Sequence, residues 1–337
     1  MLESSELLQL CQRFLDGADG SRSILSRVTK EEMDVIVRTL PSLVLDASQW
    51  SRGWLTVSPT TVIPITLQAC VQLGHLRYDA MLTRVKSGLW MYALDDLLDN
   101  GGLREGDLQD VLRECFDIAC GSLAGKRDEL TYGLGELAGA LHDICEQLGA
   151  QRNHTAVYPY WLVSMTRVFE GMAYEYWLGE QFRNCDTRIG ASLPEYMHFA
   201  RYSIFVPNLW LAGLMSEPDD SLRLALASLS RLAEQCGVVV RLANDLGTCD
   251  RETKEGRINS VVLRARDLLS NAEAKDYASA VLQAKKDILQ QIRAEQVELQ
   301  RLAQCVHTHS GIERGFVRGA DFAVSLYLDR DIREWAD

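Results

Sequence analysis

Three aspartates close together in the sequence could hold a cation. Asp95, Asp96 and Asp99 follow a run of apolar residues from about Leu76 to Leu94, whose spacing predicts a helix. They fall in the last turn of that helix, where the backbone already presents partial negative charge. Mg²⁺ prefers oxygen ligands and is usually shared between carboxylates, water and substrate phosphates. The pattern therefore indicates either a magnesium site or a solvated acidic helix end.

A second set of oxygen-bearing side chains follows at helical spacing. Asn244, Thr248 and Glu252 stand at i, i+4 and i+8 in a helix expected over residues 220–254, so they share one face. An amide, a hydroxyl and a carboxylate suit Mg²⁺ and are poor ligands for zinc or copper. Arg251 and Lys254 lie beside the carboxylate and could pair with phosphate oxygens. An ordinary exposed polar face has the same spacing, so both interpretations stay open.

These residues need a helical framework, and the composition favours one. The chain has 337 residues, of which 47% are hydrophobic and only 7 are proline. Segments with helical periodicity dominate and strand-like alternation is missing. We therefore expect an all-α protein with a single domain over residues 1–337.

Charge and cysteine usage exclude several classes of protein. The formal net charge of −12 argues against nucleic-acid binding, which needs clustered Lys and Arg. The nine cysteines form no CxxC pair and have no histidines at zinc spacing. With no secretory signal and no apolar run of membrane-spanning length, the chain is expected to be cytoplasmic and not membrane-spanning.

Local signals predict where several helices begin and end. A capping box at residues 192–195 starts a helix that meets Pro207, so a kink that frees backbone carbonyls is expected at residues 203–207. Asn259 is expected to cap the next helix. A second capping box at residues 270–273 predicts a helix to about Val306, and a final helix is expected over residues 311–330. Pro64 is expected to open a helix near the N-terminus.

Both acidic motifs together resemble those of class I terpene synthases, most closely bacterial kaurene-synthase-like diterpene synthases. Residues 95–99 are similar to their DDxxD motif, and residues 244–252 to (N/D)DxxSxx(K/R)E, with Thr248 in place of serine. The resemblance extends to Gly256, Asn259 and Ser260 after the second motif. Glu195–Tyr196 with Ser203–Ile204 resembles the kinked helix of the bacterial enzymes.

The resemblance implies one helical bundle around a central apolar cavity, with a role for each motif. Asp95 would bind Mg²⁺ with help from Asp96 and Asp99, and Asn244, Thr248 and Glu252 would bind another ion, three ions being expected in all. Asp95, Asn244 and Arg201 are the expected catalytic residues. The diphosphate of the substrate would contact Arg201, Arg251, Lys254 and Tyr327, with Arg330 and Arg333 as further C-terminal candidates. The offset of Arg201 from Tyr196 differs by one residue from the bacterial pattern.

The implied chemistry begins when an allylic diphosphate leaves under Mg²⁺ assistance. The resulting carbocation must be shielded from water by apolar and aromatic walls, because ring faces attract positive charge. For each aromatic candidate, ordinary core packing is an equal alternative. The candidates, with the kink serine, are Trp90, Phe169, Tyr176, Trp177, Ser203, Phe205 and Trp210.

The resemblance implies a C20 isoprenoid diphosphate as substrate. Kaurene-synthase-like enzymes use a bicyclic labdadienyl (copalyl-type) diphosphate made by a separate class II cyclase, and the sequence has no DxDD motif for that reaction. Geranylgeranyl diphosphate is the equal alternative and farnesyl diphosphate a further one. The rival functions are a chain-elongating prenyltransferase and a non-catalytic helical scaffold. The oligomeric state is left open, with a homodimer allowed.

Overall fold

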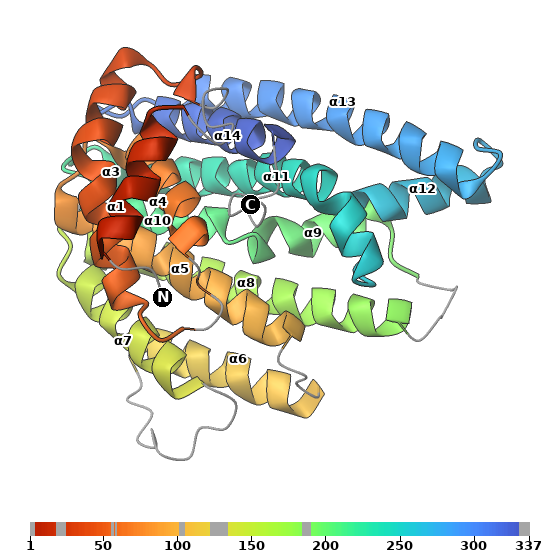
Figure 1. The fold of residues 1–337 in the computed structure, drawn as a ribbon, viewed down its shortest axis with the longest axis horizontal. Coiled ribbons are helices and arrows are strands. Elements are labelled where there is room, and N and C mark those ends of the chain that lie inside the picture. The colour runs from red at the N-terminus through yellow and green to blue at the C-terminus, as the bar shows by residue number, and fades with distance from the viewer. Residues whose placement is uncertain are drawn as a thin grey trace.

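The protein is built from α-helices (Figure 1). The computed structural model describes residues 4–17, 25–54, 57, 59–100, 105–121, 134–183 and 190–329, and every regular element in these ranges is helical. The predicted all-α class is therefore confirmed. The helices are α1 (Ser4–Leu15), α3 (Lys30–Trp50), α4 (Pro59–Leu73), α5 (Tyr78–Asn100), α6 (Glu105–Ala119), α7 (Leu134–Gly149), α8 (His154–Arg183), α9 (Leu193–Ser203), α10 (Val206–Ser216), α11 (Leu222–Lys254), α12 (Ser260–Ser270), α13 (Tyr277–Gln304) and α14 (Ile312–Asp329).

Helix α11 runs through the middle of the bundle. It packs against α13 and α14 on one side and against α9 and α10 on the other (Figure 1). Leu229, Ala233, Cys236, Val240 and Ala243 repeat at helical spacing and are almost completely buried. This burial carries the second acidic motif, at the C-terminal end of α11, into the interior.

Helix α5 is buried on most of its surface and packs against α3, α4, α7 and α10. Val85, Leu89, Trp90 and Leu94 are fully buried, as expected of a helix that is apolar around much of its circumference. We expected Asp95 in the last turn of this helix. The helix continues to Asn100, so Asp95 lies in the turn before the last.

The expected kink after residue 203 is a complete break between two helices. Ser192 caps α9 by accepting a hydrogen bond from the Glu195 amide at 3.3 Å, which confirms the predicted start. Phe205 has φ +63°, a left-handed conformation that ends α9. Pro207 then lies in the first turn of α10, where a missing N–H does no harm.

Two predicted helix starts are wrong. Residues 270–273 do not open a helix, because α12 ends at Ser270 and Asp276 caps α13 through a reciprocal pair of hydrogen bonds with Ser279. Pro64 lies inside α4, which already begins at Pro59. In both cases the residue types are those of a helix start, but the helix begins at a different residue. The N-cap at Asn259 is confirmed, with its side chain accepting from Val262 N at 3.0 Å.

None of the helices in the described ranges is long and apolar enough to cross a membrane. The cysteines in those ranges are free thiols. Burial raises the pKa of several of them, including that of Cys70 to about 11, so they remain protonated at neutral pH.

Candidate active site

A cavity of about 640 Å³ opens between the central helices. Its walls come from α4, α5, α8, the break between α9 and α10, α11 with the segment that follows it, and α14. Apolar side chains such as Ile65, Met91, Leu209 and Val240 line one part, and ionisable groups line another. A volume of this size is typical of pockets that enclose a small organic ligand.

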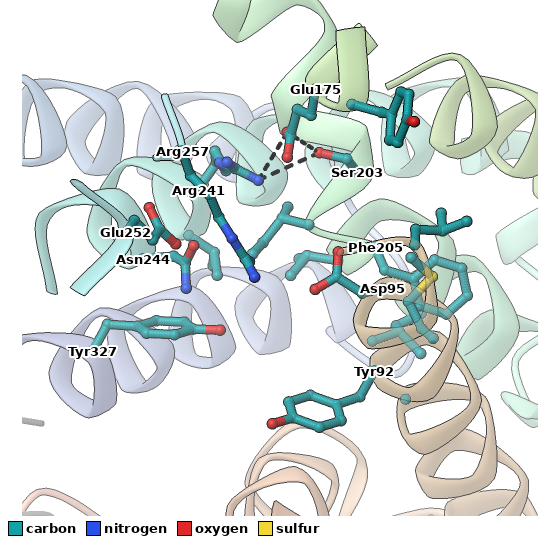
Figure 2. A pocket seen from close by; sticks show the side chains of 18 of the residues that line it. Tyr92, Asp95, Glu175, Ser203, Phe205, Arg241, Asn244, Glu252, Arg257 and Tyr327 are labelled. Carbon is teal, nitrogen blue, oxygen red and sulfur yellow. Dashed lines mark hydrogen bonds and ion pairs between the residues drawn. The ribbon is translucent and has the colours of Figure 1, made fainter. Parts of the chain in front are cut away.

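The two acidic motifs face this cavity from opposite walls. Figure 2 shows Asp95 on α5 directed into the space, and Asn244 and Glu252 on α11 across from it. Both motifs thus contribute oxygen atoms to one hollow, although 149 residues separate Asp95 from Asn244.

The remaining predicted metal ligands are placed differently. Thr248 is buried, and its hydroxyl donates to the Asn244 carbonyl at 2.8 Å and does not line the cavity. Asp96 is half-buried and also off the cavity wall. The side chain of Asp99 lies outside the described residues, as do Arg330 and Arg333.

The Glu252 carboxylate is held in place from the segment after α11. Asn259 donates from Nδ2 to Glu252 Oε2 at 3.0 Å, while its own Oδ1 caps α12. One amide therefore fixes both the start of α12 and the direction of the carboxylate. This double role gives a physical reason for an asparagine at this point in the sequence.

The donor chemistry of the two walls fits Mg²⁺. Carboxylate and amide oxygens are hard ligands, and none of the described residues that line the cavity carries a thiol or an imidazole. Within the described part of the chain, no three His, Cys, Asp or Glu side chains form a cluster that could hold a metal ion. An ion here would therefore also need amide or hydroxyl oxygens, water and oxygens of a ligand. Asp95, Asn244 and Glu252 are the side chains that could hold it.

Among the predicted diphosphate contacts, Arg251 and Tyr327 line the cavity, and Arg257, which sequence reasoning missed, joins them (Figure 2). The expectation for two others needs correction. Arg201 is absent from the wall because its guanidinium packs over the Tyr202 ring, 4.9 Å from the centroid. Lys254, at the end of α11, is exposed and also off the wall.

Of the predicted cavity residues, Tyr176, Ser203 and Phe205 line the wall and four others do not. Trp90 is fully buried behind Phe205 and donates to the Leu137 carbonyl at 2.9 Å. Trp210 stacks on Phe316 with ring centroids 4.0 Å apart. Phe169 is buried in the core, and Trp177 is 46% exposed on the outside of α8. For Trp90, Phe169 and Trp210, core packing and not cavity lining is the correct interpretation, whereas Trp177 lies on the surface.

A buried ion network that the sequence did not reveal forms part of the cavity wall. The Arg241 guanidinium lies 2.7 Å from Asp245 Oδ1 and 2.9 Å from Glu175 Oε1, and it donates to the Tyr196 hydroxyl. Ser203, at the end of α9, donates to Glu175 at 2.6 Å (Figure 2). The network therefore ties α8, α9 and α11 together beside the cavity.

The network shifts the ionisation of its members. Burial raises the pKa of Glu175 to about 7, although Arg241 and Ser203 act in the opposite direction. Burial would lower the pKa of Arg241, but Asp245 and Glu175 raise it well above its ordinary value. One signal was available in the sequence, since Arg241 directly follows an apolar run and a charge there must find a partner. The partner Glu175 is 66 residues away, and no local pattern identifies it.

The balance of charge on the cavity wall is close to neutral. Carboxylates come from Asp95, Glu175, Glu180, Glu252 and Glu255, and guanidinium groups from Arg84, Arg241, Arg251 and Arg257. Several of these are already paired with each other, as Arg251 is with Glu255 at 2.9 Å. The described residues of the wall thus lack the excess positive charge that a polyanionic ligand requires.

Most of the chain is similar to a known protein family. Residues 86–287, more than half of the chain, match the family model described as terpene synthase family 2, C-terminal metal binding. The chain belongs to the terpene synthase family. The matched region includes both acidic motifs and ends within α13.

Individual relatives of this terpene synthase are distant. The chloroplastic ent-kaurene synthase of Marrubium vulgare is 25% identical over 226 residues, which is 66% of this chain and 28% of that protein. The chain thus spans less than a third of the length of that relative.

Solved structures share the fold. Abietadiene synthase from Abies grandis superimposes with a TM-score of 0.67 and 16% identity, over 90% of this chain and 40% of that one. The 2-methylisoborneol synthase of Streptomyces coelicolor A3(2), in complex with Mg²⁺ and geranyl-S-thiolodiphosphate, gives 0.63 and 13%, over 86% and 91% of the two chains.

Proposed function

We propose that this terpene synthase is a class I enzyme that ionises an allylic isoprenoid diphosphate with the help of Mg²⁺ and then guides carbocation cyclisation. The observation that carries the proposal is the cavity of about 640 Å³ with Asp95 on one wall and Asn244 and Glu252 on the other. A diphosphate adds several negative charges to a wall that is almost neutral. Divalent cations between the carboxylates and the diphosphate would balance them.

Each wall has a part in this reaction. When bound, Mg²⁺ would supply Lewis-acid stabilisation of the departing diphosphate. Asp95, Asn244 and Glu252 would hold the ions, three being expected, and Arg251, Arg257 and Tyr327 stand at the same end to contact diphosphate oxygens. Tyr176 and Phe205 would face the carbocation and exclude water. Carbonyls freed at the break near Phe205 are further groups that could stabilise positive charge.

We propose a C20 substrate, either a bicyclic copalyl-type diphosphate supplied by a separate class II cyclase or geranylgeranyl diphosphate. The support is the similarity to ent-kaurene synthase and the likeness to abietadiene synthase. The 337 residues contain no DxDD motif, so the cavity described above is proposed to act on the diphosphate and not by protonation. Farnesyl diphosphate is the second candidate, because the volume of the cavity admits a C15 chain as well.

The test is incubation of the purified protein with Mg²⁺ and each of three diphosphates: copalyl, geranylgeranyl and farnesyl. Products are identified by mass spectrometry and diphosphate release is measured in parallel. Cyclic hydrocarbons or alcohols from one substrate support the proposal. Longer prenyl diphosphates, formed when isopentenyl diphosphate is added, would identify a chain-elongating enzyme. Absence of turnover with every substrate would contradict the proposal and favour a scaffold.

A further inference from the structure

A buried arginine lies at the far end of the cavity from the acidic motifs. Arg84 lines the wall from α5, eleven residues before Asp95 on the same helix. At 1.5 Å and 100° per residue, the two positions are about 16 Å apart along the axis and only about 20° apart around it. Both residues therefore project from one face of α5 and mark opposite ends of the same hollow.

Arg84 is poorly compensated within the protein. It is only 3% exposed, and within the described part of the chain its guanidinium makes one hydrogen bond, from Nη2 to Gln72 Oε1 at 2.8 Å. Its Nε is buried without an acceptor, and none of the described carboxylates lies within ion-pair distance. Burial lowers the pKa of Arg84 to about 9, so the group is still positively charged at neutral pH.

The contrast with Arg241 shows how unusual this is. Arg241 is equally enclosed but has two carboxylates within 3 Å, at 2.7 and 2.9 Å. A buried charge without such partners costs several kcal/mol, which a structural arginine recovers through hydrogen bonds. Arg84 makes only one with the described residues, and donors that face a hollow can be satisfied by a ligand oxygen placed there.

The surroundings of Arg84 leave room for that oxygen. Gln68, half-buried on α4, lines the same wall and adds a second polar group. Gly88 lies one turn further along α5, where a Cβ atom would stand 3.7 Å from Arg84 Nη1 and 3.0 Å from Ile65 Cγ2. A side chain at residue 88 would occupy the space in front of the guanidinium, and glycine leaves it open.

We propose that Arg84 and Gln68, with Gln72 orienting the guanidinium, form a second binding site of this cavity, for a hydrogen-bond-accepting oxygen at the end away from Asp95. The inference rests on the proposed function, because the diphosphate at the Asp95 end sets which part of the ligand reaches Arg84. Two sources can supply the oxygen. One is a hydroxyl or carboxylate on the hydrocarbon part of the substrate, and the other is a water molecule held by Arg84.

A water held there would have a chemical consequence. Its oxygen lone pair can form the C–O bond to the last carbocation, and the resulting oxonium then loses its proton to a second water molecule. The product is an alcohol. A substrate oxygen, in contrast, leaves the reaction unchanged and sets the choice of substrate.

Equilibrium binding distinguishes this site from the metal end. We would titrate the protein, with Mg²⁺, with geranylgeranyl S-thiolodiphosphate and with its analogue hydroxylated at the terminal carbon, using calorimetry. If the oxygen comes from the substrate, the wild-type protein binds the hydroxylated analogue about tenfold more tightly, as a hydrogen bond to a charged group implies. Arg84→Met loses this preference. The matched control is Arg77→Met, which removes an exposed arginine just before α5 whose recorded partner is Asp79, and which leaves the preference unchanged.

If the oxygen comes from water, the wild-type protein binds the two analogues equally tightly. In H₂¹⁸O the wild-type protein then forms an alcohol labelled with ¹⁸O, whereas Arg84→Met forms mainly olefin. The proposal is overturned if wild type shows neither the binding preference nor labelled alcohol, or if Arg84→Met retains whichever of them wild type shows. Should Arg84→Met fail to fold, Gln68→Leu tests the same site and keeps the buried arginine. An unchanged binding preference and an unchanged product in Gln68→Leu would contradict the proposal. If the wild-type protein turns over none of the substrates, the proposed function is refuted but this inference is not. The binding preference measured by calorimetry then tests the inference.

Discussion

At the scale of single residues, position relative to the cavity separates side chains of the same type. Asp95 and Asp96 are neighbours, but only Asp95 lines the cavity, since successive residues of a helix point about 100° apart. Asp250 and Glu252 differ in the same way: Glu252 lines the cavity, while Asp250 pairs with Lys285 on the outside at 2.8 Å.

The first prediction concerns the proposed metal ligands. Asp95→Ala and Asn244→Ala should each lower turnover at least about a hundredfold, because each removes an oxygen ligand from an ion whose contribution amounts to several kcal/mol. Helicity measured by circular dichroism should stay the same. Asp250→Ala, the matched control on the outer face of α11, should retain nearly full activity. Wild-type rates from Asp95→Ala would contradict the assignment.

The second prediction concerns Glu175, whose pKa burial raises to about 7 from an ordinary value of 4.5. The folded protein then binds this proton more tightly than the unfolded chain does. The contribution of Glu175 to stability is therefore greatest below about pH 4.5 and declines as the pH rises through 7. Glu175→Gln lacks this titration. As the pH rises from 5 to 8, the unfolding free energy of wild type should therefore decrease relative to that of the variant.

Urea denaturation of the metal-free proteins across that range measures the effect. Glu170→Gln, on the same helix and in an exposed pair with Arg167, is the control for the same change of side chain at the surface. If the difference in unfolding free energy between wild type and Glu175→Gln does not change with pH, the assignment of a raised pKa to Glu175 is wrong.

At the scale of elements, close helix contacts fix the geometry of the cavity. Gly247 stands inside the second acidic motif, and a Cβ atom there would lie 2.4 Å from the carbonyl oxygen of Tyr327 on α14. A glycine at residue 247 therefore lets α14 approach α11 and brings the Tyr327 side chain to the cavity wall. A similar approach occurs at Gly237, where a Cβ would lie 2.3 Å from the Arg201 carbonyl.

The third prediction follows from this contact. Gly247→Ala should destabilise the protein by about 1–3 kcal/mol, because backbone atoms cannot yield as a flexible side chain can. It should also raise KM by displacing Tyr327. Gly139→Ala, in α7 with open space around the site, is the matched control and should stabilise the protein by up to about 1 kcal/mol through helix propensity. Equal melting temperatures for the two variants would argue against the contact between α11 and α14.

At the scale of the whole molecule, the proposed site takes its side chains from two walls, with Asp95 on α5 and Asn244 on α11, which only the folded chain brings to one cavity. Binding energy that links the walls should therefore appear as stability of the folded protein.

The fourth prediction is a cooperative shift in melting temperature. Mg²⁺ alone, or geranylgeranyl S-thiolodiphosphate alone, should raise Tm by little, and both together should raise it by several degrees, since each supplies charge that the other needs. EDTA should reverse the shift and abolish turnover. Asp95→Ala should show no cooperative shift. Full stabilisation by the diphosphate analogue in EDTA would show that the cavity binds it without metal.

The sequence by itself determined the helical class, the long central helix and the two sets of oxygen-bearing side chains. It also predicted a kink near residue 203, where the structure has a complete break. Each of these depends on local chemistry: periodicity, a capping side chain, a proline or the spacing of residues along one helix. The same local signals were wrong at residues 270–273, where a second cap at Asp276 competes for the start of α13.

The tertiary structure alone decided which of those side chains share a cavity. Trp90 and Tyr176 are both aromatic residues on apolar helices, but one packs behind Phe205 and the other lines the wall. Arg201 was expected to contact the substrate and does not line the cavity, whereas Arg84 and Arg241 do. The physical reason is that burial and charge pairing depend on residues far apart in the chain, such as Glu175 for Arg241, and sequence spacing carries no record of those contacts.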